Sequence, residues 1–400
     1  MLADVRPDVW NLVHIVTKLE LGGAQLATLD EVQHSRFCTG GRFLLAGPGG
    51  LLDAEARALA EARFVPIAAL GRELSPAADS RALWALWRSL TALRRSRPGE
   101  RFLVHTHSSK AGVLGRLAAR LAGADRVVHS IHGFGYHRLQ PPLSRALFRT
   151  AERLAARLCD GLTADSAANL EQARQDRVAG ARLPTRVIHC GIDVEAFRRP
   201  RRPPAEIRAA LEIPHGHRVV LNVSCLKPQK DPLAFVELAA RVLARAPATT
   251  FLLAGDGELR GPVEALGRRL DLGGRLRLLG WRRDVADLLH ASDLLVSTSL
   301  WEGLPQVFAQ AMAAARPIVA TGVDGAPEAV RHRDSGLLYP VGDVDGMADG
   351  VLELLAQPEL AARMGARAVE LVPQFSRERM LADLDRFYAE VAAAPRRRRG

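Results

Sequence analysis

The feature that most constrains this chain is a regular alternation of short apolar segments with amphipathic ones. In the first half, apolar segments bounded by Gly, Pro or Asp have the composition of strands, and they cover residues 11–16, 42–45, 63–68, 102–105, 126–131, 161–164 and 185–189. Between several of them, for example over 83–93 and 113–121, apolar residues recur at helical spacing. Strands that alternate with helices in this way predict a parallel sheet covered by helices on both faces.

A segment rich in arginine and proline, 197–204, interrupts this pattern, which then starts again. The segment cannot continue a helix and predicts a stiff linker. The strand-like segments that follow cover residues 218–223, 250–254, 276–279, 294–297, 317–320 and 337–339. Because 400 residues are too many for one ordinary core, we predict an α/β protein with two Rossmann-like doubly wound domains facing across a cleft.

The expected boundaries follow from these segments. The first domain is expected over 1–196, the linker over 197–205 and the second domain over 206–374. A long helix is expected over 375–394, packing back on the first domain, and a basic tail over 395–400.

The distribution of charge indicates that the first half of the chain binds an anionic partner. Residues 1–200 hold 28 Lys and Arg against 19 Asp and Glu, a balance of +9, whereas residues 201–400 hold 27 against 25, a balance of +2. Nucleic acid, an anionic membrane surface or a phosphorylated substrate could each require such a balance. We expect no nucleic acid, because only the charge favours it. Only 4 of the 55 basic residues are lysine, and Lys227 and Lys230 share one loop.

Several classes of protein are not expected. No segment has about 18 uninterrupted apolar residues, and the N-terminus lacks a basic and then apolar signal, so we expect a cytoplasmic protein. The four cysteines, Cys38, Cys159, Cys190 and Cys225, have no metal-ligand spacing and are expected to be buried free thiols. The sequence as a whole shows no convincing metal-ligand cluster, and we expect no metal and no cofactor.

In the first half, candidate functional residues follow the ends of predicted strands. Gly22 and Gly23 come before a helical segment, where backbone N–H groups can approach an anion, although a tight turn would also need glycine. His105, His107 and His132 lie at two further strand ends, and histidine there can bind a sugar hydroxyl or a departing phosphate, or merely satisfy the local backbone. Of the three, His132 is the strongest candidate because glycine follows it.

In the second half, two helix starts carry charged residues. Lys230 precedes Asp231 and Pro232, which are typical of a helix N-cap and first position, so its ammonium group and the helix dipole can share a diphosphate. Glu302 stands just outside another helix start, where the N–H groups of Gly303 and Leu304 face an anion.

Taken in order, these motifs resemble the family-4 retaining glycosyltransferases of group 1 type, which have the GT-B fold. The resemblance covers nearly the whole chain. The motifs that carry it are Gly22-Gly23, the stretch 107–116, His132-Gly133-Phe134, Gly191-Ile192-Asp193, Glu302-Gly303-Leu304-Pro305, Gly325-Ala326-Pro327-Glu328 and Gly336-Leu337-Leu338.

The resemblance implies a hexosyl transfer from a nucleotide sugar, most often a UDP-sugar, to a glycan, lipid-linked or other acceptor held by the first domain. It implies retention of anomeric configuration without a metal, and a place in cell-envelope or exopolysaccharide synthesis. Catalytic roles fall on His132, which faces the donor sugar, and Glu302, which holds its hydroxyls. The donor-binding positions are Gly22, Gly23, Cys225, Lys230, Gly303, Leu304, Gln310 and Glu328.

Two positions depart from the family. Where the family commonly has an arginine five residues before the lysine, this chain has Cys225, and a second glutamate is replaced by Gln310. An arginine–phosphate hydrogen bond contributes about 1.5–3 kcal/mol, and a thiol cannot replace it. Arg282 and Arg283 are candidates to replace the missing guanidinium.

Other functions remain open at this stage. A nucleotide-sugar-binding protein without turnover and a sugar-nucleotide epimerase would use the same folds. An NAD-dependent oxidoreductase is disfavoured, because no GxGxxG follows the first strand. The segment 81–97, with Trp84 and Trp87 among five arginines, favours a helix lying on an anionic membrane, or else a core-facing tryptophan pair under a solvated basic face.

Overall fold

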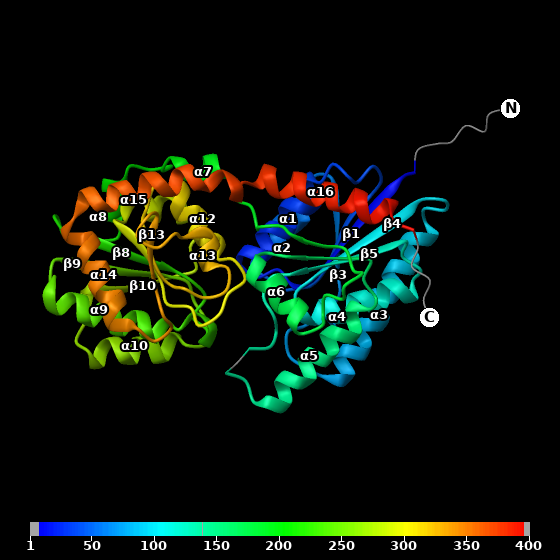
Figure 1. The fold of residues 1–400 in the computed structure, drawn as a ribbon, viewed down its shortest axis with the longest axis horizontal. Helices are drawn as coiled ribbons and strands as arrows, with labels where there is room; N and C mark the ends of the chain where they lie inside the picture. The colour runs from blue at the N-terminus through cyan, green and yellow to red at the C-terminus, as the bar shows by residue number, and fades with distance from the viewer. Residues whose placement is uncertain (1–7, 138, 396–400) are drawn as a thin grey trace. The chain divides into compact units, whose positions relative to one another are not determined.

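The computed structural model describes residues 8–137 and 139–395, so Arg396–Arg399 of the expected basic tail lie outside the described residues. The chain forms two compact units (Figure 1). Unit 1 comprises the chain up to Cys190 together with the part from Arg377 onward, and unit 2 comprises Gly191–Ser376. The cleft expected between them stays a prediction.

Unit 1 is built on a seven-stranded parallel sheet with the strand order β3-β2-β1-β4-β5-β6-β7. All seven strands expected in the first half are present, namely β1 (Trp10–Lys18), β2 (Arg42–Gly47), β3 (Ala62–Pro66), β4 (Arg101–His107), β5 (Arg126–Ile131), β6 (Gly161–Ala164) and β7 (Thr185–Val187). The helices are α1 (Gly23–His34), α2 (Asp53–Arg57), α3 (Pro76–Arg95), α4 (Ser109–Leu121), α5 (Pro142–Ala156), α6 (Ala167–Gln175) and α16 (Arg377–Ala393).

Unit 2 repeats the plan with six parallel strands in the order β10-β9-β8-β11-β12-β13. The strands, again all expected, are β8 (Arg218–Val223), β9 (Thr249–Ala254), β10 (Leu276–Gly280), β11 (Leu294–Ser297), β12 (Ile318–Thr321) and β13 (Gly336–Tyr339). The helices are α7 (Val194–Arg198), α8 (Pro204–Ala210), α9 (Pro232–Arg245), α10 (Arg260–Arg269), α11 (Val285–Ala291), α12 (Gln306–Ala313), α13 (Ala326–Ala329), α14 (Val344–Ala356) and α15 (Pro358–Leu371), with 3-10 turns η1 (Pro228–Lys230), η2 (Gly273–Arg275) and η3 (Val372–Phe375).

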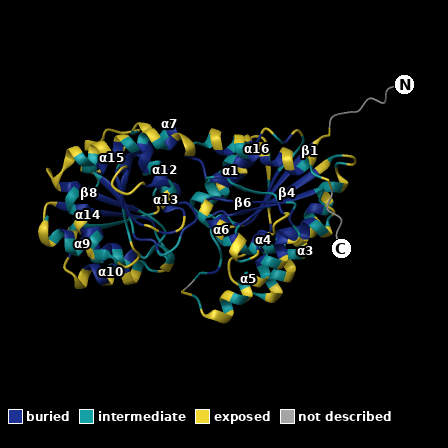
Figure 2. Ribbon diagram, viewed as in Figure 1, coloured by how far each residue is buried: buried dark blue, intermediate teal, exposed yellow. Residues whose placement is uncertain are grey.

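Both sheets are doubly wound, so the fold class predicted from the sequence is confirmed. In both, the central strands are buried along most of their length, as Figure 2 shows in dark blue, because helices cover the two faces. The strand order reverses direction between β1 and β4 in unit 1 and between β8 and β11 in unit 2. Ligands of such sheets bind outside the carboxyl ends of the strands at these points of reversal.

The segment expected as a stiff linker is held on unit 2 by hydrogen bonds. The two units divide at Gly191, before the expected linker at 197–205, and α7 and α8 occupy both ends of that segment. Between these helices, the backbone N–H groups of Arg201 and Arg202 donate to Asp287 Oδ1 at 2.7 and 3.2 Å. Pro200 follows the end of α7 and Pro204 begins α8, and the Asp287 carboxylate anchors the backbone between the two helices.

The last helix, α16, belongs to unit 1, and it starts at Arg377 rather than at residue 375 because η3 precedes it. Asp385 accepts hydrogen bonds from Ser35 Oγ at 2.5 Å and from the backbone N–H of Arg36 at 2.8 Å. The Phe387 and Tyr388 side chains of α16 are buried against the sheet of unit 1. Among the described residues, no helix has both the length and the apolar character required to span a bilayer.

Candidate functional site

In unit 2, the loops after β8 and β11 carry the residues singled out from the sequence. These strands are neighbours, so their loops start side by side at the carboxyl edge. As expected, Asp231 caps α9, with its Oδ1 accepting from the N–H of Ala234 at 3.3 Å, and Pro232 takes the first helical position. Thr298 Oγ1 donates to the backbone oxygens of Lys230 and Asp231 at 3.0 and 2.8 Å, which ties the two loops together.

Lys230 and Glu302 meet at this edge. Lys230 Nζ lies 2.5 Å from Glu302 Oε1, and the glutamate side chain is only 6% exposed. The backbone N–H of Glu302 donates to Asp324 Oδ2 at 2.6 Å. Both the backbone and the side chain of Glu302 are therefore held by polar contacts. The two residues are 72 positions apart in the sequence and form one charged pair at the point where the strand order reverses.

The other donor-binding positions of unit 2 gather around the same loops. Gly303 and Leu304 are buried directly before Pro305, the N-cap of α12, which begins at Gln306. Gln310 lies half-buried one turn further along this helix. A helix start of this kind offers N–H groups and a positive dipole end to an anion.

Cys225, the other departure from the family, and Glu328 also lie in unit 2. Cys225 is half-buried just after β8, and Glu328 is half-buried in α13. Arg282 is not free to replace a phosphate-binding arginine, because it forms two hydrogen bonds with Asp284, at 2.8 and 2.5 Å. No side-chain partner of Lys227, which precedes η1, is recorded among the described residues.

In unit 1, the loops after β1 and β4 enclose a pocket of about 490 Å³. Residues of β1, α1, α3, α4 and α5 and of the segment between β5 and α5 line it. Leu114, Tyr136 and Phe148 lie on its apolar side, and Lys18 and Lys110 on its basic side. Gly22 is the extended N-cap of α1, whose first turn also borders the pocket. All four lysines of the chain therefore lie at the carboxyl edge of one sheet or the other.

His132 follows β5, and its neighbour across the sheet is Asp165, which follows β6. Because Ile131 pairs with Ala164, the next residues of both strands lie side by side. His132 Nδ1 donates to Asp165 Oδ2 at 2.9 Å, and its Nε2 lies 2.9 Å from His107 Nδ1. Burial lowers the pKa of His132, but the charge and hydrogen bond of Asp165 raise it more, so the net shift is upward.

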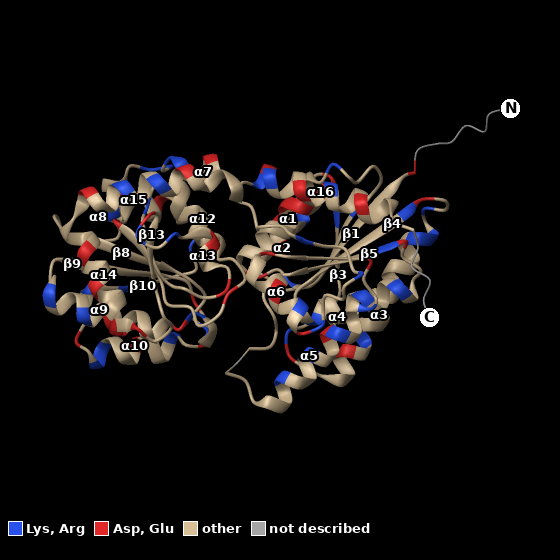
Figure 3. Ribbon diagram, in the orientation of Figure 1, with Lys and Arg blue, Asp and Glu red and all other residues tan. Residues whose placement is uncertain are grey.

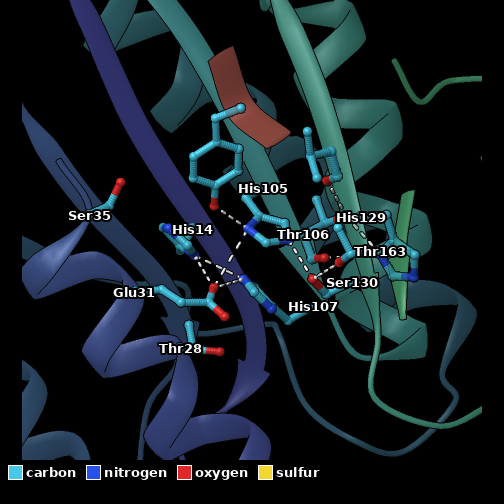
Figure 4. A network of polar contacts seen from close by, with 12 residues as sticks. His14, Thr28, Glu31, Ser35, His105, Thr106, His107, His129, Ser130 and Thr163 are labelled. Carbon is cyan, nitrogen blue, oxygen red and sulfur yellow. Dashed lines mark hydrogen bonds and ion pairs between the residues drawn. The ribbon is translucent and has the colours of Figure 1, made fainter. Parts of the chain in front are cut away.

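Through its contact with His107, His132 adjoins a buried polar network in the sheet (Figure 4). His14 is opposite His105 in the register of β1 and β4, and His107 shares the face of His105 because side chains alternate along a strand. His14 Nδ1 lies 2.9 Å from His107 Nε2, and Glu31 reaches this group from α1. Burial lowers the pKa of His14 to about 3 and raises that of Glu31 to about 8.

Sequence reasoning found His105, His107 and His132 but missed His14, Glu31, Asp165 and Tyr388. His14 gave a signal, since a histidine inside an otherwise apolar strand of a two-sided sheet is bound to be buried. Glu31, Asp165 and Tyr388 gave none, because α1, β6 and α16 bring them in from distant parts of the sequence. The cysteines are all free, as expected, but Cys225 is half-buried rather than buried.

The predicted site residues thus form two groups. Lys230, Glu302, Gly303 and Leu304 come together in unit 2, and His132 joins the histidine network in unit 1. Gly22 and Gly23 begin α1, whose first-turn residue Gln25 lines the pocket, but the glycines themselves do not line it.

Comparison with known proteins agrees with this architecture. Residues 44–196 match the family described as Glycosyltransferase Family 4, and residues 204–370 match the family described as Glycosyl transferases group 1. A UDP-Gal:alpha-D-GlcNAc-diphosphoundecaprenol alpha-1,3-galactosyltransferase from Escherichia coli is 30% identical over 352 residues, which cover 86% of this chain and 87% of that enzyme.

Solved structures agree on the fold. HepE from Anabaena, crystallised with UDP-glucose, has a TM-score of 0.79 at 21% identity and covers 95% of this chain and 99% of its own. A sucrose-phosphate synthase from Thermosynechococcus elongatus has a TM-score of 0.82 at 22% identity, with 96% and 100% covered. With two doubly wound units and these matches, the chain belongs to the group 1 glycosyltransferases of family 4 and has the GT-B fold.

Proposed function

We propose that this protein transfers a hexosyl unit from a UDP-sugar to a lipid-linked acceptor, with retention of configuration and without a metal ion in the transfer step. The observation that carries the proposal is the Lys230–Glu302 pair at the carboxyl edge of unit 2. Its setting in cell-envelope or exopolysaccharide synthesis is part of the proposal.

The pair suits a nucleotide sugar because its two members prefer different parts of one ligand. A lysine ammonium carries three donors and a full charge, which match a diphosphate, and the adjacent helix starts add N–H groups. Once Lys230 turns to the diphosphate, Glu302 Oε1 is released and can accept hydrogen bonds from sugar hydroxyls. Before the donor binds, the charges of Lys230 and Glu302 thus neutralise each other.

His132 is proposed to act on the donor-sugar side of the reaction. The Asp165 carboxylate fixes its Nδ1–H, which sets the ring orientation and leaves Nε2 toward His107. In the family chemistry that we adopt, the leaving diphosphate takes the acceptor proton, so no protein base is required on that side.

The pocket of unit 1 supports an amphiphilic acceptor. It combines an apolar wall, including Leu114 and Phe148, with the ammonium groups of Lys18 and Lys110 and the guanidinium of Arg72. Lys110 is paired with Asp79 at 2.5 Å, and Lys18 with Glu20 at 3.3 Å. Such a lining matches an acceptor with a phosphate group and a hydrocarbon chain, and the Escherichia coli relative is named for a diphosphoundecaprenol acceptor.

The helices that border this pocket also support a membrane surface. Leu143 and Leu147 of α5 are 83% and 65% exposed, and Leu154 continues the same stripe two turns later. On α3, Trp84 and Trp87 are 55% and 39% exposed, so these tryptophans are not the core-facing pair of the alternative interpretation. Arginines are interspersed along α3 and α5 (Figure 3). Exposed apolar residues among cations favour an anionic lipid surface.

Donor turnover tests the enzymatic part of the proposal. A thermal-shift screen of UDP-, GDP- and ADP-sugars identifies the donor, because a ligand at 100 times its dissociation constant stabilises the protein by about 2.7 kcal/mol. We expect UDP-sugars to stabilise, and the wild type to release UDP from the donor while Glu302→Ala binds without turnover. No turnover by either protein, with binding retained, would indicate a binding protein, and an isomeric nucleotide sugar as product would indicate an epimerase.

Co-sedimentation with vesicles tests the membrane part. We expect the wild type to bind vesicles rich in phosphatidylglycerol at low salt, and Leu143→Asp with Leu147→Asp to abolish that binding. Leu270→Asp, on the exposed surface of unit 2, is the matched control and is expected to bind like the wild type. Equal binding by all three proteins would remove α5 from the proposal.

A further inference from the structure

The proposed function leaves the buried network of unit 1 unexplained. His14, Glu31, His105 and His107 are all buried, and one candidate ligand atom of each lies within 4.8 Å of the others. They come from three elements, β1, α1 and β4, and Figure 4 shows their side chains converging on one point. The prediction that the chain has no metal-ligand cluster was based on spacing along the sequence. These four residues show no metal-ligand spacing, because the fold brings them together from separate elements.

The distances around Glu31 are similar to those between the ligands of one metal ion. Glu31 Oε2 lies 3.6 Å from His14 Nδ1, 3.7 Å from His105 Nδ1 and 3.6 Å from His107 Nε2. All three distances are too long for hydrogen bonds, and this oxygen has no other partner in the described part of the chain. Four ligands bound tetrahedrally to zinc at about 2.0–2.1 Å lie about 3.3–3.4 Å apart, so these separations are close to tetrahedral edges.

The energetic cost of burying the Glu31 carboxylate also favours a bound cation. A buried oxygen without a hydrogen bond is rare in folded proteins, and a buried carboxylate without a counter-charge is costly. Each of the three imidazole nitrogens that face it can supply a lone pair. A divalent cation at their centre would compensate the Glu31 carboxylate and use all four ligand atoms at once.

Neighbouring residues hold two of the histidines from behind, as is usual for metal ligands. His105 Nε2 lies 2.7 Å from Ser130 Oγ, and that hydroxyl lies 2.5 Å from Thr163 Oγ1. His107 Nδ1 lies 2.9 Å from His132 Nε2, and His132 is fixed in turn by Asp165.

We propose that His14, Glu31, His105 and His107 bind a structural zinc ion inside unit 1, tying α1 to the two central strands. His14 Nδ1 and His107 Nε2, now 2.9 Å apart, would separate by about 0.4 Å to reach a tetrahedral edge. The Tyr388 hydroxyl, 2.5 Å from His105 Nδ1, would lose its hydrogen bond with that nitrogen, which would bind the metal instead. Because all four ligands are buried protein side chains, the site is closed, as structural zinc sites are, and the ion takes no part in the proposed transfer step.

A second group, His132, Asp165 and Cys190, is a weaker candidate. Its members already form ordinary contacts, with His132 Nδ1 2.9 Å from Asp165 and 3.7 Å from Cys190 Sγ. None of the three leaves a buried oxygen without a partner, as Glu31 does. The experiment below separates the two groups.

The test measures zinc bound to the full-length protein after removal of any affinity tag. Protein treated with chelator and then given zinc sulfate is passed through gel filtration, and its metal content is measured by mass spectrometry. We expect one zinc per chain in the wild type and in Cys190→Ser and His129→Ala. We expect none in Glu31→Gln or His14→Ala. His129 is a matched control, since it is buried on the neighbouring strand outside the four-residue group.

A cobalt titration of the wild type keeps the proposal testable if a buried variant fails to fold. Cobalt(II) in a closed four-coordinate site gives a strong visible absorption that the hydrated ion lacks, so we expect this band to saturate at one equivalent. The proposal is overturned if the wild type retains no zinc and shows no such band. It is equally overturned if Glu31→Gln keeps the metal, or if Cys190→Ser alone loses it.

Discussion

Units 1 and 2 share a strand order but place their polar residues differently. In unit 2 the charged groups of the site stand in loops at the carboxyl edge, and the interiors of β8 and β11 are mainly apolar. In unit 1 the two central strands carry five fully buried polar residues, namely Asn11, His14, His105, Thr106 and His107. The same topology therefore supports a site built from loops at the edge of one sheet and a polar network built through the other.

The difference determines what a mutation costs. In unit 2 a polar side chain near the edge can exchange its protein partner for water or ligand. In unit 1 a buried partner has no replacement, so removing it leaves a desolvated group behind. The following predictions test this difference, beginning with the largest effect.

The largest effect is expected from the buried ion pair that joins α4 to α5 in unit 1. Arg116 is fully buried, and its Nη2 donates to Glu152 Oε2 at 2.6 Å. Glu152→Ala leaves the guanidinium buried without its counter-charge, so we expect the free energy of unfolding to fall by about 3–5 kcal/mol. Urea unfolding followed by circular dichroism measures this loss.

The matched control is an exposed pair in unit 2. Asp345 pairs with Arg241, and its side chain is 83% exposed. We expect Asp345→Ala to change the free energy of unfolding by no more than about 0.5 kcal/mol. If the two variants lose similar stability, buried charge does not distinguish the units energetically.

The same difference explains how much the sequence could predict. All thirteen strands were predicted, because each is a short apolar run with clear ends. Lys230 and Glu302 were found because each lies in a local motif beside a helix start. Asp165 and Tyr388 could not be found, because only pairing of β5 with β6 and packing of α16 bring them to the histidines.

The next effect concerns the donor site of unit 2. We expect Lys230→Ala to weaken binding of the UDP-sugar by about 10- to 150-fold, because charge-assisted hydrogen bonds contribute about 1.5–3 kcal/mol. Calorimetric titration with the UDP-sugar measures it. Lys227→Ala, in the same loop, is the control and is expected to have the smaller effect. A larger loss in Lys227→Ala would transfer the diphosphate contact to that residue.

Restoring the missing guanidinium should act in the opposite direction. Cys225 is half-buried at the end of β8, and Arg282 is committed to Asp284. We expect Cys225→Arg to tighten binding of UDP by up to about tenfold, which corresponds to about 1.4 kcal/mol. Cys225→Ala should leave the dissociation constant unchanged, and an equal effect of both variants would show that the thiol, rather than the lost arginine, determines the affinity.

The smallest expected effect is at Gln310 on α12. A carboxylate accepts hydrogen bonds from two ribose hydroxyls, whereas an amide accepts with its oxygen only. Exchanging the neutral for a charged acceptor gains about 1 kcal/mol, so Gln310→Glu should tighten UDP binding roughly fivefold. Gln310→Ala should weaken it, since it removes both partners of the ribose. If both substitutions weaken binding, the nucleotide requires the N–H donor of the amide. Gln310 would then be as intolerant of a changed hydrogen-bond partner as the buried residues of unit 1.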